Sequence, residues 1–435
     1  MSDTPTVASV RRRRLGGGFG VVGLWLVTRA WSIFALHGVE HIVVGDVAYY
    51  WRSITALGQV GLPLTLREYP TPVVWLLTVP ALVSGGSREG YLVAFAAAML
   101  LLDGAMTHAL WRGAGRHHDV AVDFWIAYPV LVGPLSYARF DMIPAVLVGW
   151  ALLAARSRPW LTGALTGLGA AIKLWPALLV GAFAARRRGR GAMLGAFGVV
   201  GIGLAALSLA IGGRARLFSP LNWQSDRGLQ IESIWATPLM VARVTDPTRW
   251  RIRYSTFKAY QLMGPGVSEW VRISTIATAV GLVLTLALFI RGVRCRYLSS
   301  MALGLLVLAT VAITILTNKT LSPQYLLWLG GPAAVLLLHR ADQGPRWRRR
   351  VGGLAIVLLV VAALTQLTYP VLYQGLLGRR GPTAQLLATI VFVLRNLGLV
   401  VIALLSLVWA WLALSRRPPA RKPIEADQGG STDRA

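Results

Sequence analysis

The stretch WLTGALTGLGAAIKLWPALLVGAFAA, residues 160–185, decides how this chain crosses a membrane. It is long enough for one helical span, yet basic residues flank it on both sides, Arg158 before it and 186–190 after it. Because basic loops stay on the cytoplasmic side, a single crossing would leave one of these clusters on the wrong side. Pro176 disrupts a helix, and non-helical backbone at membrane depth usually lines a cavity. The stretch therefore predicts two half-spans that turn near Lys173; the alternative is one kinked helix whose lysine reaches to the surface.

The remaining sequence has the composition of a multi-span α-helical membrane protein. Of its 435 residues 55% are hydrophobic and only 14% are charged, and only helices satisfy their backbone over repeated spans of lipid. Basic loops between the apolar runs predict about twelve transmembrane helices, with both termini in the cytoplasm. The expected spans are 19–38, 91–111, 120–136, 142–155, the two half-spans of 160–185, 191–211, 271–290, 298–316, 325–338, 351–368 and one within 384–414, with a short surface helix at 73–84.

The chain divides into one membrane domain and two tails. We expect a cytoplasmic N-terminal tail at 1–18, a single transmembrane domain at 19–414 and a disordered cytoplasmic tail at 415–435. The basic run 11–14 holds the N-terminus in the cytoplasm; the alternative is the start of a signal peptide. The long outer loops, 39–90 and 212–267, are expected to shape the site.

The formal charge of +27 does not predict a nucleic-acid partner, because the basic residues punctuate apolar spans and do not line one soluble surface. The single cysteine, Cys295, excludes an intrachain disulfide and a cysteine-based metal site. The six histidines show no metal-ligand spacing, and His117-His118 falls in an inner loop. No metal or other cofactor is expected.

Asp46 is the candidate general base. It follows the first span in the segment Gly45-Asp46-Val47-Ala48-Tyr49-Tyr50, outside the lipid but close to the bundle. Partial burial there would raise the basicity of a carboxylate toward the working range of a base. An aspartate before an apolar stretch also caps a helix well, and the spacing alone leaves both interpretations open.

Several cations fall at span ends on the same outer side. Arg139 and Asp141 flank Phe140, either as a local ion pair or as an arginine that contacts a phosphate and is oriented by its neighbouring carboxylate. Lys173 and Lys319 are two of only four lysines in an arginine-rich chain, and both suit a phosphate as mobile point charges.

Three further groups of polar residues have two interpretations each. The segment 226–233 mixes hydrogen-bond donors and acceptors between Trp223 and Trp235, as in a sugar site or an interfacial loop with tryptophan anchors. Arg29 and Asp103 lie inside spans, as part of a functional site or as a structural pair. A basic outer patch either holds an anionic lipid headgroup or merely rests on one; its residues are Arg243, Arg249, Arg251, Arg253 and Lys258.

Several of these segments together resemble the GT-C glycosyltransferases, and most closely family 87, the actinobacterial polyprenol-phosphate-mannose-dependent α-(1→2)-mannosyltransferases. The segments are 45–50, EYPTP at 68–72, ARFDMIP at 138–144, AIKLWP at 171–176, RGLQIES at 227–233 and LSPQYLLW at 321–328. The family's Tyr-Pro-Pro reads Tyr69-Pro70-Thr71-Pro72 here, a small departure.

The resemblance implies a GT-C fold with juxtamembrane helices and a site on the outer face of the plasma membrane. It implies an inverting transfer of mannose from polyprenyl-phosphate-mannose to a lipid-linked mannoside of the phosphatidylinositol-mannoside type, with Asp46 as base. The donor phosphate would be held by some of Arg139, Lys173, Arg227 and Lys319. The residues expected to bind sugar or acceptor are Tyr49, Glu68, Tyr69, Asp141, Gln230, Glu232, Gln324 and Tyr325.

Two other functions stay open at this point. One is a GT-C transferase that uses another lipid-linked sugar, such as arabinofuranose or glucose, because nothing in the sequence reads the sugar directly. The other is a lipid or sugar-lipid transporter. The absence of an internal repeat and the gathering of polar residues on one side argue against a transporter, since alternating access needs a site near the midplane.

Overall fold

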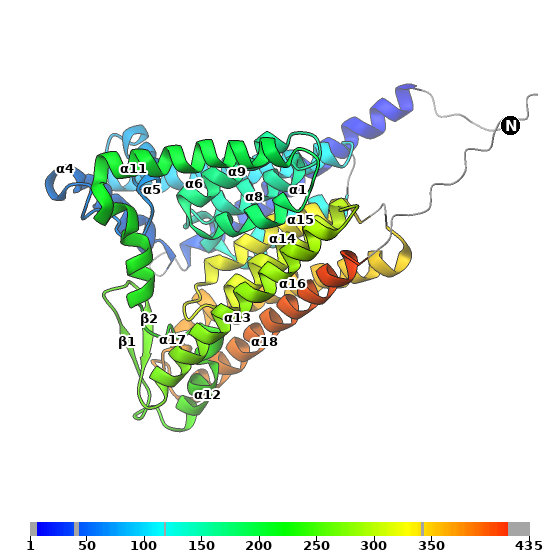
Figure 1. Cartoon of the computed structure of the whole chain (residues 1–435). Helices are drawn as coiled ribbons and strands as arrows, with labels where there is room; N and C mark the ends of the chain where they lie inside the picture. The colour runs from blue at the N-terminus through cyan, green and yellow to red at the C-terminus, as the bar shows by residue number, and fades with distance from the viewer. Residues whose placement is uncertain (1–6, 39–42, 117–118, 341–342, 416–435) are drawn as a thin grey trace, which may run out of the picture.

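A computed structural model describes residues 7–38, 43–116, 119–340 and 343–415. These residues form a helical membrane protein with one small two-stranded sheet, so the predicted all-α class is confirmed. In Figure 1 the helices run side by side near the described chain ends and fan apart toward the end that carries β1 and β2. The predictions for residues 1–6 of the N-terminal tail, for His117-His118 and for the tail beyond Ser415 fall outside the described residues.

Seven helices in the described part are long and apolar enough to cross a membrane. They are α1 (Val7–His37), α6 (Arg88–Gly113), α11 (Arg190–Asp226), α13 (Val267–Arg294), α14 (Ser300–Thr317), α16 (Pro345–Gln366) and α18 (Pro382–Ala413). Shorter elements lie between them: α3 (Gly45–Thr55), α4 (Leu57–Val60), α5 (Thr71–Val83), α7 (Val120–Val132), α8 (Met142–Ala154), α9 (Pro159–Ile172), α10 (Leu179–Ala184), α12 (Thr237–Thr245), α15 (Leu327–Leu338) and α17 (Tyr373–Leu376). The irregular helical turns are η1 (Pro134–Tyr137), η2 (Trp175–Leu178), η3 (Ile234–Ala236), η4 (Pro323–Leu326) and η5 (Leu367–Val371), and the strands are β1 (Arg251–Tyr254) and β2 (Tyr260–Met263).

The chain turns back at Lys173, as the flanking basic residues predict. Helix α9 ends at Ile172, and Lys173 takes an extended conformation (φ −147°, ψ 131°) before η2 and α10. After α10 the chain returns to the start of α9: a Cβ at Gly189 would lie only 2.3 Å from Cγ of Pro159. The chain therefore turns back between two short helices, and the single kinked helix is wrong; that these helices are half-spans of a membrane stays a prediction.

Irregular turns that begin with a proline occur at the ends of several short helices. Each of η1, η2 and η4 carries a proline in its first turn, where the missing N–H costs no hydrogen bond. Helix α7, which leads into η1, is joined to η4, because Tyr128 in α7 donates a hydrogen bond to the carbonyl of Leu326 (2.8 Å). The short helices α8 and α15 are almost completely buried, as is α14. Irregular turns at the ends of a rigid buried core thus supply the site.

Helix α11 differs from the expected loop that begins at residue 212. The helix continues to Asp226, with a kink at Gly213, whose φ of 72° favours glycine. Beyond the kink, the buried Arg216 donates hydrogen bonds to the carbonyls of Tyr69 (2.9 Å) and Leu66 (3.4 Å). The second half of α11 therefore holds the loop that follows α4 in place beside the site.

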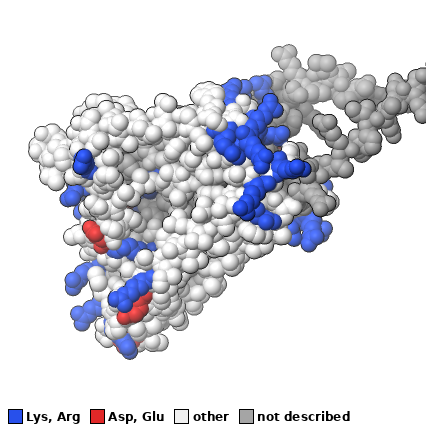
Figure 2. All heavy atoms as spheres, viewed as in Figure 1, with Lys and Arg blue, Asp and Glu red and all other residues white. Residues whose placement is uncertain are grey.

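Charged residues gather at the two ends of the molecule. In Figure 2 one end is dense in Lys and Arg without visible acidic residues, the other mixes both signs, and a band of uncharged side chains separates them. The basic end includes residues 186–190, which join α10 to α11, and residues 346–350, at the start of α16, and both match the positive-inside pattern. Which end faces the cytoplasm stays a prediction.

Candidate functional site

Two neighbouring cavities meet at Asp46 at the mixed-charge end. The tyrosine cavity, of about 600 Å³, is lined by Gly45, Asp46, Tyr49, Arg52, Arg139, Gln230, Glu232, Tyr254, Lys258, Ala259, Tyr260, Ser322, Pro323, Gln324, Tyr369, Tyr373, Gln374 and Leu377. The tryptophan cavity, of about 240 Å³, is lined by Asp46, Tyr49, Glu68, Tyr69, Pro70, Lys173, Leu174, Trp175, Pro220, Trp223, Gln224, Arg227, Phe257, Lys258, Thr314, Asn318, Ser322, Gln324, Tyr325 and Trp328. The residues common to both linings are Asp46, Tyr49, Lys258, Ser322 and Gln324.

Asp46 lies in the first turn of α3, where the helix dipole stabilises a carboxylate. It is not the helix cap, because the N-cap residue is Val44 and makes no side-chain capping bond. Its Oδ2 is 2.7 Å from Nε of Arg139, yet 39% of its side chain stays exposed. Asp46 is therefore an oriented carboxylate that a substrate in either cavity can reach.

Arg139 has a different partner from the one expected. Its guanidinium pairs with Asp46 and not with Asp141, and it also donates to the carbonyls of Val43 and Ala138 (both 2.8 Å). The buried arginine thus ties the loop after η1 to the start of α3. It lines the tyrosine cavity, so its predicted contact with a phosphate stays a prediction.

Lys173 pairs with Asp141 at the wall of the tryptophan cavity. Its Nζ is 2.5 Å from Oδ1 of Asp141, which also accepts a hydrogen bond from the indole of Trp328 (2.7 Å). The ammonium lies over the rings of Phe140 (5.1 Å), Tyr325 (5.3 Å) and Trp328 (5.1 Å). Because Asp141 and three aromatic rings surround Lys173, its ammonium is held in one position and presents a fixed positive charge to this cavity.

Glu68 and Tyr49 form a second polar contact in the tryptophan cavity. The Tyr49 hydroxyl donates to Oε1 of Glu68 (2.8 Å). Burial raises the pKa of Glu68, while backbone and Tyr49 hydrogen bonds oppose the rise. Tyr69, the next residue, packs edge-on against Phe140 with ring centroids 4.9 Å apart.

The loop after α11 contributes to both cavities. Arg227 lines the tryptophan cavity and donates to the carbonyl of Phe257 (3.3 Å), whereas Gln230 and Glu232 line the tyrosine cavity. Glu232 is buried 3.5 Å from NH2 of Arg395, and burial raises the pKa of this carboxyl to about 7 against the opposing effect of the arginine. Arg395 was missed from the sequence, although an arginine inside an apolar span is itself a signal of a polar partner.

Lys319 lies in neither cavity lining. Its ammonium donates to the carbonyl of Ser225 (2.7 Å), and burial lowers its pKa. The neighbouring loop does reach the site: Gln324 lines both cavities, and Tyr325 stacks on Trp328 with centroids 4.1 Å apart.

The sequence interpretation also missed four tyrosines of the tyrosine cavity. They come from the sheet and from the turns after α16, and they are Tyr254, Tyr260, Tyr369 and Tyr373. Tyr373 lies edge-on to both Tyr260 (5.9 Å) and Tyr369 (4.8 Å). The Tyr-rich segment just after an apolar span was the available signal.

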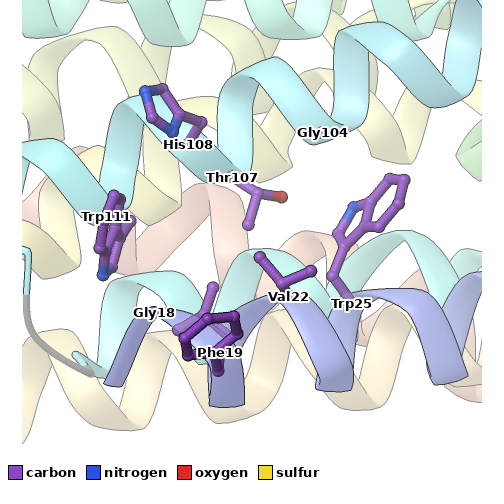
Figure 3. Close-up of a pocket in the computed structure, with 9 residues that line it drawn as sticks. Gly18, Phe19, Val22, Trp25, Gly104, Thr107, His108 and Trp111 are labelled. Atoms are coloured by element: carbon purple, nitrogen blue, oxygen red, sulfur yellow. The ribbon is translucent and has the colours of Figure 1, made fainter. Parts of the chain in front are cut away.

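Figure 3 shows a third pocket, of about 480 Å³, between α1 and α6. Its lining includes Trp25, Thr107, His108 and Trp111 but no carboxylate, lysine or arginine. It offers no carboxylate and no lysine or arginine for a phosphate, so it is a weaker candidate for the active site than the two cavities at Asp46.

The intramembrane charges Arg29 and Asp103 form a structural pair. Nε and NH2 of Arg29 donate to the two oxygens of Asp103 (2.6 and 2.9 Å), and NH1 donates to the carbonyl of Ile126 (2.6 Å). The Tyr137 hydroxyl in η1 also donates a hydrogen bond to Asp103 (3.1 Å). Both charges are buried, and neither lines a cavity described above, which favours the structural interpretation.

Among the residues that the structure describes, no group of three or more His, Cys, Asp or Glu side chains could hold a metal ion. The tyrosine cavity still contains Asp46 and Glu232, each paired with an arginine. The expectation that no metal takes part remains a prediction.

The candidate site is thus an accessible carboxylate between two polar, aromatic cavities of a helical membrane protein. Residues 68–262 match the model of glycosyltransferase family 87. The match spans slightly less than half of the chain and includes Lys173, Arg227 and Glu232, whereas Asp46 lies before it. No curated protein matches the chain. The family match supports a membrane glycosyltransferase; it does not identify the sugar, the linkage or the acceptor.

Proposed function

We propose that this protein transfers mannose from polyprenyl-phosphate-mannose to a lipid-linked mannoside, of the phosphatidylinositol-mannoside type, at the outer face of the plasma membrane. The observation that carries the proposal is the position of Asp46, which belongs to both cavity linings. An acceptor in one cavity and a donor in the other would meet at this carboxylate.

The tryptophan cavity suits the donor. Its apolar and aromatic wall, with Leu174, Trp175 and Trp223, fits a prenyl chain, and Lys173 and Arg227 supply positive charge for a phosphate. Because Lys173 is held by Asp141 and three rings, its charge is already in place when the phosphate arrives.

The tyrosine cavity suits the sugar acceptor. Tyrosine, glutamine and glutamate side chains provide hydrogen-bond donors and acceptors for hydroxyl groups, and aromatic rings provide flat apolar surfaces for a sugar ring. Gln230, Gln324 and Glu232 offer such polar groups in the lining. Its larger volume, about 600 Å³, supports an acceptor that already carries mannose.

The reaction is a single inverting displacement. An acceptor hydroxyl oxygen attacks the anomeric carbon of the donor, and the bond from that carbon to the phosphate oxygen breaks. The hydroxyl proton moves to Asp46, and polyprenyl phosphate leaves with the electron pair. Arg139 keeps Asp46 in place through Nε (2.7 Å). A positioned base contributes about 10²–10⁴ in rate.

The direct test is transfer by the purified protein in lipid vesicles with labelled polyprenyl-phosphate-mannose and a mannosylated lipid. We expect label in the acceptor lipid and inversion at the anomeric carbon. Competition by unlabelled lipid-linked arabinofuranose or glucose decides the sugar. Movement of intact donor across the bilayer, without transfer, would identify a transporter and reject the proposal.

A further inference from the structure

The tip of the β1–β2 hairpin carries Lys258, which from sequence alone belongs only to the basic outer patch. The strands pair antiparallel with Tyr254 opposite Tyr260, and the turn closes with a hydrogen bond from the Lys258 amide to the Ser255 carbonyl (3.1 Å). Lys258 has a φ of 57°, in the left-handed region that non-glycine residues rarely adopt. Such a conformation persists where the surroundings hold it, and it is frequent at functional sites.

The hairpin is fixed to the loop that follows α11. The Ile231 amide donates to the Tyr260 carbonyl (3.1 Å), and the Leu262 amide donates to the Leu229 carbonyl (2.9 Å). Arg227 adds a hydrogen bond to the carbonyl of Phe257, the residue just before Lys258 (3.3 Å). The tip is therefore held against a segment that itself lines both cavities.

Lys258 lies where the two cavities meet. It lines both, and its Nζ is 5.6 Å from the centroid of the Tyr49 ring. Tyr49 follows Asp46 by three residues in α3, so both side chains lie on the same face of that helix. The ammonium is thus on the side of α3 from which Asp46 is reached.

Among the described residues, no carboxylate balances the charge of Lys258. Lys173 pairs with Asp141, and Arg139 pairs with Asp46, but no carboxylate in the described ranges lies within ion-pair distance of Lys258. Of the lysines and arginines in the two linings, Lys258 alone belongs to both. An unbalanced cation in a cleft gains most from an arriving anion.

We propose that Lys258 binds the donor phosphate at the junction and stabilises the departing polyprenyl phosphate. This inference rests on the proposed function. When the bond between the anomeric carbon and the phosphate oxygen breaks, that oxygen keeps the electron pair, and the phosphate passes from a singly charged diester to a monoester of greater charge. Lys258 keeps its proton and donates it in a hydrogen bond. Because this contact strengthens as charge develops, it accelerates the bond-breaking step.

The experiment measures binding of polyprenyl phosphate, with neutral polyprenol as the matched probe, to the full-length protein in nanodiscs. We expect Lys258→Met to weaken polyprenyl phosphate binding about tenfold or more, as for the loss of a charge-assisted hydrogen bond, and to leave polyprenol binding unchanged. Transfer of mannose should fall at least as much, since the contact is stronger in the transition state.

Two variants separate charge from backbone effects. Lys258→Asn also removes the charge but suits the left-handed conformation, so it should lose binding as Lys258→Met does. Arg272→Met removes a charge from an exposed position of α13 outside both linings and should bind normally.

The outcomes separate this inference from the proposed function. Normal phosphate binding and transfer by both Lys258 variants, beside an active wild-type protein, would overturn the role of Lys258 alone. A loss confined to Lys258→Met would assign the effect to the backbone and also overturn it. A wild-type protein that neither binds polyprenyl phosphate nor transfers mannose would overturn both.

Discussion

Two arginine–aspartate pairs occupy different regions of this molecule, and their surroundings separate structure from chemistry. Arg29 and Asp103 are buried between α1 and α6, and tyrosine, tryptophan and backbone groups fill the remaining hydrogen-bonding positions of the pair. Arg139 and Asp46 are as close, at 2.7 Å, but Asp46 keeps 39% of its side chain exposed at the junction of two cavities. Of these two pairs, only the one with an accessible partner lines the cavities.

The largest effect is expected when Asp46 loses its basicity. Asp46→Asn keeps the volume of the side chain, so we predict a folded protein whose mannosyl transfer falls by about 10² or more. Asp246→Asn, which alters a partly exposed carboxylate outside both linings, is the matched control and should retain activity. If purified Asp46→Asn turned over near the wild-type rate, Asp46 would not be the base, and the pair of Arg139 and Asp46 would be structural like that of Arg29 and Asp103.

Substitutions in the pair of Arg29 and Asp103 should lower the free energy of unfolding of the protein. Asp103→Asn leaves Arg29 buried without its counter-charge, and we expect a loss of about 3–5 kcal/mol, read as a lower midpoint of thermal unfolding. The double variant Arg29→Met with Asp103→Leu should lose less, because neither charge remains buried. If Asp103→Asn were as stable as the wild type but inactive in transfer, the pair would belong to the site.

The pair of Glu232 and Arg395 combines features of both. Its two residues are buried, like Arg29 and Asp103, and Glu232 lines the tyrosine cavity, as Asp46 does. Burial raises the pKa of Glu232 from the usual 4.5 of glutamate to about 7. The folded state therefore favours the protonated form, whose stabilising effect is complete below pH 4.5 and is lost as the pH rises through 7.

We accordingly predict that the unfolding temperature of the wild-type protein falls between pH 5 and 8. Glu232→Gln cannot ionise and should show a flatter profile over that interval. The pKa of Glu68 is also raised, so this residue too makes the unfolding temperature fall as the pH rises. The variant Glu68→Gln measures that separate contribution. Identical profiles for the wild type and Glu232→Gln would show that Glu232 stays ionised beside Arg395.

The sequence predicted those features that depend on local pattern and on charge. Apolar runs gave the spans, basic flanks predicted the turn at Lys173, and the segment after the first span singled out Asp46. The hairpin was not predicted, because each strand has only four residues, and the alternation Arg-Ile-Arg-Tyr of β1 is too short to stand out in an arginine-rich loop.

Pairing partners could not be predicted, because they depend on how distant loops meet. Arg139 was expected beside Asp141, two residues away, but it pairs with Asp46 from another loop. Glu232 pairs with Arg395, 163 residues further along the chain. Lys319 was expected at the phosphate, yet its ammonium donates a hydrogen bond to the backbone carbonyl of Ser225.

The short helices under the site set its depth, and depth decides which nucleophile reaches the sugar. Helix α7 has 13 residues, as does α8. At about 1.5 Å per residue each spans roughly 20 Å, against a hydrocarbon layer of about 30 Å. We therefore expect the turns between them to lie below the level of the lipid headgroups. Bulk water is scarce at that depth, so hydrolysis of the activated sugar should be slow compared with its transfer to a hydroxyl group delivered within the bilayer.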